Sequence, residues 1–258
     1  MSDDLLVVSG LTHKYGGVRA VNSCSLSVRR GSVTALIGPN GAGKTTLVSV
    51  VSGTERLQSG EVQFDGAGIG GWPSYRIARR GLLRSFQLSR EFGGLTVVDN
   101  LLVVGQDTSL ENPISAVFQS ATARRRESSL LERVAELLQE VGLYEVRDRY
   151  ARELSGGQKR LLELARVMFA EPKMALLDEP MAGVNPVLIE RVCELIVRWQ
   201  HRGVTFLIVE HKLEVVEAIC DHVIVMVGGS KLAAGTMLEL RGNPEVVGAY
   251  LGGTAAHA

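Results

Sequence analysis

One stretch near the N-terminus, Ser32–Thr46, constrains the fold more than any other part of this chain. It opens with the apolar run Ser32–Ile37, which predicts a buried strand, and a glycine-rich segment follows. The next residues, Thr46–Val51, can continue as a helix. The stretch therefore predicts a strand, a loop and a helix in direct succession.

The glycine-rich segment has the spacing of a phosphate-binding loop. Its glycines allow backbone N–H groups to turn inward around a polyphosphate, because no Cβ stands in the way. Lys44 would add a positive charge near the terminal phosphates, the Thr45 hydroxyl would ligate Mg²⁺, and the following helix would add its positive end. The alternative is a glycine-rich turn that contains a lysine by chance. The predicted phosphate-binding residues are Gly38, Pro39, Asn40, Gly41, Ala42, Gly43, Lys44, Thr45 and Thr46.

The composition excludes several classes of protein. At 258 residues the chain is long enough for a sizeable core. Its 28 Lys and Arg residues balance 28 Asp and Glu residues, so no net charge favours nucleic acid as a partner. The apolar runs are shorter than the about 20 residues that span a bilayer, and the start of the chain lacks a signal-peptide pattern. We therefore expect a soluble, cytoplasmic protein.

The cysteines point to the same compartment. Cys24, Cys193 and Cys220 are odd in number and lie far apart, without a Cys-x-x-Cys pair. This spacing favours neither a disulfide framework nor a zinc site. We expect all three to be core thiols in a reducing compartment.

Hydrophobic patterns predict a β-rich part first and a helical part after it. Strand-like runs at Leu5–Val8, Val18–Val28 and Glu61–Phe64 are separated by turns. Helical periodicity dominates only after about Pro73, and in Leu130–Val141 apolar residues recur at i, i+3, i+4 and i+7. We therefore expect a helical insertion in the middle of the chain.

The segment around 106–129, which follows a helix expected at Val97–Val104, is expected to be a loop. It carries three consecutive arginines at 124–126. Such a run is typical of a solvated surface, and contact with an anionic lipid or a partner is the alternative.

After Ser155 the patterns of helix and strand alternate. Helices are expected at Gln158–Ala170 and Pro186–His201, and strands at Met174–Leu177 and Thr205–Val209. Both strands are continuous apolar runs, as expected of a parallel sheet covered on both faces. We therefore predict an α/β fold with one nucleotide-binding unit.

Polar residues end two of these strands. Asp178 and Glu179 come at the end of a buried strand, where α/β sheets usually bind ligands. Asp178 would hold Mg²⁺ through its water shell, and Glu179 would orient or deprotonate an attacking water. A polar strand end that caps the next turn is the alternative. His211 follows the neighbouring strand, and we expect it to contact the γ-phosphate and hold the attacking water, although a lone histidine is more often structural.

Gln87 and Tyr15 are two further candidates. Gln87 follows a short predicted strand, Leu83–Phe86, and its amide can reach a metal or water and withdraw again as the loop moves. It therefore suits a sensor better than a catalyst. Tyr15 precedes two glycines in the β-rich part and could stack on an adenine ring.

The segment Leu154–Gln158 is the most discriminating motif. Two glycines after a serine open an amphipathic helix, which would make a second anion site of N–H groups and positive helix dipole. A monomer with one phosphate loop has no evident need for two such sites. If the second site closes on nucleotide held by another subunit, two copies facing head to tail bury two ATP molecules. The residues expected at that nucleotide are Ser155, Gly156, Gly157 and Gln158.

The order of these motifs resembles that of an ABC-transporter ATP-binding subunit over essentially the whole chain. The resemblance implies a single ATP-binding domain, 1–258, with a P-loop NTPase (RecA-like) core. An N-terminal antiparallel β-subdomain and the phosphate loop would occupy about 1–87, an inserted α-helical subdomain about 88–156, and the rest of the core and the tail about 157–258. It also implies an ATPase that uses ATP and Mg²⁺. The residues at the chemistry would be Glu179, His211, Lys44 and Gln87, with Thr45, Gln87 and Asp178 at the metal.

The same resemblance implies partners. ATP-driven closure of a dimer would move integral-membrane permease subunits, and the dimer would be either a homodimer or a heterodimer with a paralogous ATPase. The full complex would include an extracytoplasmic substrate-binding protein and no nucleic acid. The chain would be peripheral, at the cytoplasmic face of the inner membrane.

Finer details resemble the ATPases of branched-chain amino-acid importers. These details are the segments Arg84–Gln87, Leu95–Asn100, Ala182–Pro186 and Asn243–Gly252. The chain departs from the pattern at Lys212, where an acidic residue commonly follows the histidine. Alternatives are the ATPase of a lipopolysaccharide exporter or of a urea or amide importer, a soluble non-transport ABC protein, and a purely regulatory nucleotide-binding module.

Overall fold

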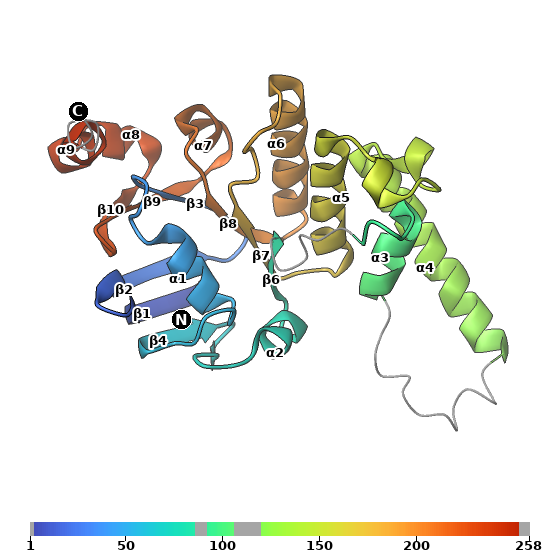
Figure 1. The fold of residues 1–258 in the computed structure, drawn as a ribbon, viewed down its shortest axis with the longest axis horizontal. Helices are drawn as coiled ribbons and strands as arrows, with labels where there is room; N and C mark the ends of the chain where they lie inside the picture. The colour runs from blue at the N-terminus through green and yellow to red at the C-terminus, as the bar shows by residue number, and fades with distance from the viewer. Residues whose placement is uncertain (1–2, 86–91, 106–119, 253–258) are drawn as a thin grey trace. The chain divides into compact units, whose positions relative to one another are not determined.

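The computed structural model of this chain describes residues 3–85, 92–105 and 120–252. Contacts divide the chain into two units. The first combines Met1–Arg84 with Pro172–Ala258, and the second is Ser85–Glu171. The first unit contains two β-sheets with helices, and the second is helical in its described residues (Figure 1).

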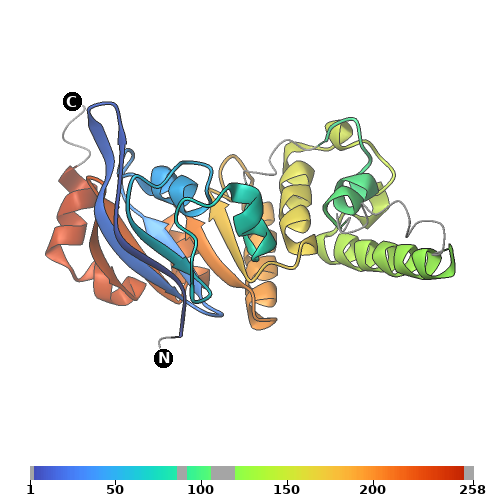
Figure 2. The same cartoon turned by 90° about the horizontal axis from the view of Figure 1, so that it is seen from below.

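The N-terminal sheet of the first unit is antiparallel, as expected, with strand order β2-β1-β4-β5. The expected first strand was too short, because β1 continues past three irregularities in its pairing with β2 to Tyr15, and the two strands form a long hairpin (Figure 2). The hairpin turns at Gly16, whose φ of +56° is a conformation that glycine adopts easily. The strands are β1 (Asp4–Tyr15), β2 (Val18–Arg29), β4 (Ser59–Phe64) and β5 (Ala67–Gly68).

The second sheet has the order β10-β9-β3-β8-β7-β6, with β10 antiparallel to β9 and the other pairs parallel. Both of its faces are buried, which explains the continuous apolar runs. On β3, Leu36 joins the core shared with the first sheet, whereas Ile37 joins a core on the opposite face. The strands are β3 (Val33–Ile37), β6 (Leu82–Arg84), β7 (Met174–Asp178), β8 (Thr205–Val209), β9 (His222–Val227) and β10 (Ser230–Gly235).

Helices cover both faces of this sheet. The core that contains α1 also contains residues from both sheets, so α1 packs between them. On the opposite face, Val216 of α7, Leu240 of α8 and Val246 of α9 pack on β3 and β9. The helices of this unit are α1 (Lys44–Val51), α2 (Ser74–Arg79), α6 (Pro186–His201), α7 (Leu213–Ile219), α8 (Met237–Arg241) and α9 (Pro244–Gly252).

In its described residues, the second unit packs three helices and two short 3-10 turns. Asn100 of α3 is completely buried, and its amide donates to the carbonyl oxygens of Phe92, Leu95 and Thr96, which holds the chain at the start of α3. Its elements are α3 (Val97–Gly105), α4 (Ser120–Val141), η4 (Tyr144–Val146), η5 (Ala151–Glu153) and α5 (Gly156–Phe169). Because α5 packs against α3 and α4, it belongs to this unit, whereas the boundary expected from sequence lay at about 156.

Two expectations need correction. The segment before residue 130 is not a loop throughout, because α4 already begins at Ser120 and includes the arginines at 124–126. The residues 120–129 contain neither Gly nor Pro, and Ala, Arg and Glu favour a helix there. Of the cysteines, only Cys24 is fully buried, while Cys193 and Cys220 are partly buried. None of the helices in the described ranges combines the length and apolar character that crossing a membrane requires.

Candidate functional site

The loop 38–46 between β3 and α1 takes its shape from contacts with neighbouring backbone. Gly38 has a φ of +150°, and a Cβ there would lie 2.1 Å from the carbonyl oxygen of Met226 on β9. Gly43 has a φ of +92°, and a Cβ there would lie 2.1 Å from the carbonyl oxygen of Ala20 on β2. Both positions therefore require glycine, and the fold itself sets the curvature of the loop.

Lys44 places a positive charge inside this loop. Its side chain is buried, and Nζ donates to the carbonyl oxygens of Gly38 at 2.8 Å and Pro39 at 2.9 Å. Burial lowers the pKa of the Lys44 ammonium, and the nearby charges of Glu179 and Asp178 act in the opposite direction. The structure thus brings the loop lysine close to both carboxylates that the sequence predicts at the site.

The N-terminus of α1 is open to a ligand. Its N-cap, Gly43, has no side chain that could cap the helix, and the first turn holds no acidic residue. The first-turn N–H groups consequently have no side-chain acceptor at the cap, and no acidic side chain of the first turn offsets the positive end of the helix. Asn40, Gly41 and Thr45 are exposed beside this end, Pro39 and Thr46 are partly buried, and Ala42 is buried.

A buried ion pair connects α1 to the end of β7. Arg84 donates from Nη2 to Asp178 Oδ2 at 2.9 Å and from Nη1 to Ser49 Oγ at 2.8 Å. Ser49 Oγ in turn donates to the carbonyl oxygen of Thr45 at 2.7 Å. One hydrogen-bond network thereby connects two of the three residues expected at the metal, the Thr45 backbone and the Asp178 carboxylate, through Ser49 and Arg84. No local sequence pattern indicates this role of Arg84, since 94 residues separate it from Asp178.

These residues fit Mg²⁺. Across the ranges that the structure describes, no group of three or more His, Cys, Asp or Glu side chains could hold a metal by itself. Mg²⁺ needs no such cage, because it usually keeps several waters and takes one or two carboxylates together with substrate phosphates. The Asp178 carboxylate and the Thr45 hydroxyl supply oxygen donors of that kind.

Glu179 and His211 face each other at adjacent strand ends. Glu179 Oε1 and His211 Nε2 are 3.0 Å apart, and both side chains are partly exposed. The Glu179 N–H donates to the carbonyl oxygen of Val209, the last residue of β8, at 2.9 Å. Glu179 has a φ of +50°, which is uncommon for a residue with a side chain and costs free energy that the surroundings must offset. A carboxylate beside a histidine can accept a proton from a bound water.

Glu210 is a further residue that sequence analysis passed over. It is only 3% exposed, and its Oε1 accepts the N–H groups of His211 at 2.9 Å and Lys212 at 3.1 Å. Its Oε2 is buried and has no hydrogen-bond partner among the described residues. Glu210 therefore fixes the backbone at His211 and Lys212 through these two hydrogen bonds. An acidic residue just before a helix is the local signal that indicates such a role.

Tyr15 lies at the end of the β1–β2 hairpin. It pairs with Val18, and Ala20 on the same strand is the residue that Gly43 approaches. The Tyr15 ring is 49% exposed and meets the His13 ring edge-on, with 4.8 Å between the ring centroids. The ring thus stands exposed on the hairpin that touches the phosphate loop. Gln87 lies outside the described residues.

Ser155, Gly156, Gly157 and Gln158 lie in the second unit, at the N-terminus of α5. Ser155 Oγ accepts the Gln158 N–H at 3.2 Å, and Gln158 Oε1 accepts the Ser155 N–H at 3.0 Å. This reciprocal capping box satisfies two of the terminal donors. The N–H groups of Gly156 and Gly157 belong to the first turn, which has no intrahelical acceptor for them.

The fold and the loop define a class first: a P-loop nucleotide-binding protein with an α/β core. The family model described as ABC transporter matches residues 21–182. The chain is 42% identical over 253 residues to the high-affinity branched-chain amino acid transport ATP-binding protein BraF of Pseudomonas aeruginosa, covering 98% of this chain and 99% of that protein. Identity to LivG of Escherichia coli, which bears the same description, is 39% over 253 residues, with the same coverage. The chain therefore belongs to the ABC transporter family and is an ATPase of that family.

Solved structures agree with this assignment. A nucleotide-free ATP-binding cassette from an ABC transporter superposes with a TM-score of 0.82 at 33% identity, covering 96% of this chain and 98% of that one. The ADP conformation of an ATP-binding cassette of an ABC transporter gives a TM-score of 0.81, also at 33% identity, and covers 96% and 99%. The expected fold class is confirmed, and nucleotide binding follows from the family.

Proposed function

We propose that this ATPase drives the import of branched-chain or related hydrophobic amino acids. One observation carries the proposal: relatives that match this chain over nearly its whole length at about 40% identity are ATP-binding proteins of branched-chain amino acid transport. The segments Leu95–Asn100 and Asn243–Gly252, which resemble the same importers, support it independently of the phosphate loop.

The phosphate loop binds the ATP polyphosphate in this proposal. Backbone N–H groups of residues 38–46 and the positive end of α1 surround the phosphates, and Lys44 exchanges its two carbonyl acceptors for phosphate oxygens. Thr45 and Asp178 would hold Mg²⁺, and Gln87 is the third residue expected at the metal. When bound, Mg²⁺ neutralises charge that develops on the transferred phosphoryl group. Tyr15 stacks on the adenine.

Glu179 and His211 act on the attacking water. Glu179 accepts a proton from that water as it attacks, and His211, 3.0 Å from Glu179 Oε1, contacts the γ-phosphate and keeps the water in line. Glu210 positions His211 through the backbone. A general base of this kind typically contributes about 10²–10⁴-fold to the rate.

The motif at α5 completes the site of a second copy. Residues 155–158 carry helix-terminal N–H donors, and a head-to-tail dimer would present them to nucleotide on the opposite subunit. The two units would together form one ATP-binding domain, whose partner in the dimer is the same chain or a paralogous ATPase. The dimer would bind permease subunits at the cytoplasmic face of the membrane, with an extracytoplasmic amino-acid-binding protein on the other side and no nucleic acid.

The test uses the complex as it occurs in its membrane. We expect the affinity-tagged chain to co-purify with two permease chains and an amino-acid-binding protein, and cells that lack the chain to lose leucine uptake. Re-expression of the wild type should restore uptake, whereas Glu179→Gln should restore assembly but not uptake, because its hydrolysis falls about 10²–10⁴-fold.

Two results would contradict the proposal. If the chain co-purified with lipopolysaccharide-export components, and cells that lack it took up leucine normally, the transported molecule would be lipopolysaccharide and not an amino acid. Hydrolysis at the native rate by Glu179→Gln would remove Glu179 from the reaction and leave the cargo assignment standing.

A further inference from the structure

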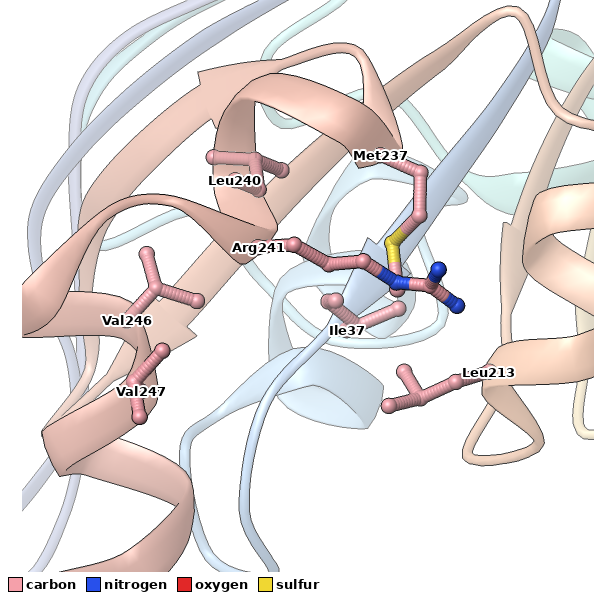
Figure 3. A pocket seen from close by; sticks show the side chains of 7 residues that line it. All are labelled: Ile37, Leu213, Met237, Leu240, Arg241, Val246 and Val247. Atoms are coloured by element: carbon pink, nitrogen blue, oxygen red, sulfur yellow. The ribbon is translucent and has the colours of Figure 1, made fainter.

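A cavity of about 230 Å³ lies on the face of the second sheet opposite α1. Residues of β3, α7, α8 and α9 line it, and its surface is almost entirely apolar. Figure 3 shows Leu240 and Val246 on one side and Leu213 on the other, with Met237 and Ile37 between them. The cavity is smaller than the roughly 300–1,000 Å³ pockets that hold drug-sized ligands, so it suits a molecule with only a few carbon atoms.

Among the residues that the structure describes, one charged side chain lines this apolar cavity. Arg241 extends from α8 across the cavity, and its guanidinium group points toward Leu213 (Figure 3). Arg241 also forms an ion pair with Glu217 of α7, and both side chains are about half exposed. A cation and an anion therefore stand side by side at the edge of an apolar space. Exposed ion pairs of this kind are weak, so a ligand can exchange with either partner.

This combination matches one class of small molecule. We infer that the cavity binds a free α-amino acid with a branched aliphatic side chain. Its carboxylate would pair with Arg241, its ammonium with Glu217, and its side chain would fill the apolar space. The inference rests on the proposed function, since it assigns to this cavity the class of molecule that the transporter moves, on the side of the membrane where the ATPase lies.

The cavity is lined by residues next in the chain to the phosphate loop and close in the chain to His211. Ile37 directly precedes Gly38 of the phosphate loop, and Leu213 follows His211 by two residues. A ligand in the cavity would contact the end of β3 and the first residue of α7 together. Binding there and binding of ATP would then influence each other by the same factor, because coupling between two sites is reciprocal.

Calorimetric titration of the purified full chain with L-leucine tests the assignment. We expect saturable binding of one leucine per chain. 4-Methylpentanoate, which lacks the ammonium, and isopentylamine, which lacks the carboxylate, should bind about two- to fivefold more weakly, since each loses one ion pair with a half-exposed side chain. Glycine, which lacks the side chain, should show no measurable binding.

Matched variants locate the ligand. Val247 lines the cavity and is 42% exposed, so Val247→Phe should fold and block binding. Leu238 is 83% exposed on α8 and does not line the cavity, so Leu238→Phe should bind leucine like the wild type. Arg241→Ala should weaken leucine binding about two- to fivefold. Arg191→Ala, which breaks another exposed ion pair, with Glu194, should not. In the wild type, saturating leucine should change ATP affinity about fivefold or more.

Several outcomes would overturn the inference. No saturable leucine binding, equal binding of 4-methylpentanoate, or leucine binding that Val247→Phe leaves unchanged would each exclude an amino-acid site here. Dimerisation that Val247→Phe abolishes, without leucine binding, would assign the cavity to a second copy of the chain. A complex that imports leucine although its purified ATPase does not bind it would overturn this inference alone. Leucine binding by a chain that is dispensable for leucine uptake would overturn the proposed function instead.

Discussion

Two glycine-containing helix N-termini, at α1 and at α5, look alike in sequence and differ in structure. At α1, a Cβ on Gly43 would collide with the backbone of β2, and the cap has no side chain. At α5, a Cβ on Gly156 would meet nothing within 4 Å, and Ser155 and Gln158 close a capping box. The first glycine is thus required by its own fold, whereas the second is not.

This difference shows where each motif meets its ligand. The loop before α1 holds its curvature through contacts within its own unit, and a buried lysine completes it. The start of α5 is stabilised by its capping box, and no neighbouring atom of its own unit lies close enough to Gly156 to require a glycine there. A close approach by nucleotide on another subunit would explain the glycine, and this supports the proposed second copy.

The largest expected effect is that of Gly43→Ala. Backbone strain at a φ of +92° and overlap with the Ala20 carbonyl oxygen should lower the free energy of unfolding by about 2–6 kcal/mol and abolish ATP binding. Gly156→Ala is the matched control, and it should keep ATP binding and raise the unfolding free energy by up to about 1 kcal/mol. Urea titration and binding of a fluorescent ATP analogue measure both quantities. Equal destabilisation by the two variants would remove the contrast between the motifs.

A charge at the second motif should separate stability from function. Gly156→Asp places a carboxylate in the first turn of α5, where the helix dipole favours it by about 0.3–1 kcal/mol, so the unfolding free energy should not fall. The same carboxylate repels phosphate, so hydrolysis should fall about 10²-fold, the size of losing one oriented donor.

The Glu179→Gln background shows at which step Gly156→Asp acts. Glu179→Gln alone should form an ATP-bound dimer on size-exclusion chromatography, and the double variant should remain a monomer that still binds ATP. A double variant that dimerises normally would mean that α5 does not contact the nucleotide.

The smallest expected effect is a pH dependence confined to the first motif. Burial lowers the pKa of Lys44 below the about 10.4 of a free lysine. As the pH rises through that lowered pKa, the ammonium is lost, and ATP affinity should fall by up to about tenfold per pH unit. Over the same interval the unfolded chain binds more protons than the folded chain, so the Lys44 contribution to stability should rise with pH.

Fluorescent ATP titrations between pH 8 and about 10.5 measure the Lys44 effect. Lys44→Met should bind weakly and without this pH dependence, whereas Gly156→Asp should retain the wild-type profile because the α5 motif contains no basic side chain. An unchanged profile for Lys44→Met would assign the titration to another group.

Signals that act over a few residues were sufficient for much of the fold. The helix Pro186–His201 was predicted with both ends correct, since Asn185 caps it, proline occupies its first turn and its apolar residues follow a helical period. The strand Thr205–Val209 was equally clear from its continuous apolar run. The start of α4 at Ser120 was missed, because an arginine run suggested a solvated loop and helix propensity is only a weak guide.

Local patterns were enough to predict the phosphate loop, the order of the motifs and the strand ends that carry Asp178, Glu179 and His211, because the signal of each is its spacing along the chain. Three contacts became visible only in the folded chain: Arg84 pairs with Asp178, the Ala20 and Met226 carbonyl groups require glycine in the loop, and Ile37 and Val246 border one cavity. These contacts join residues far apart in the chain. They depend on the strand order of the second sheet, which no local pattern specifies.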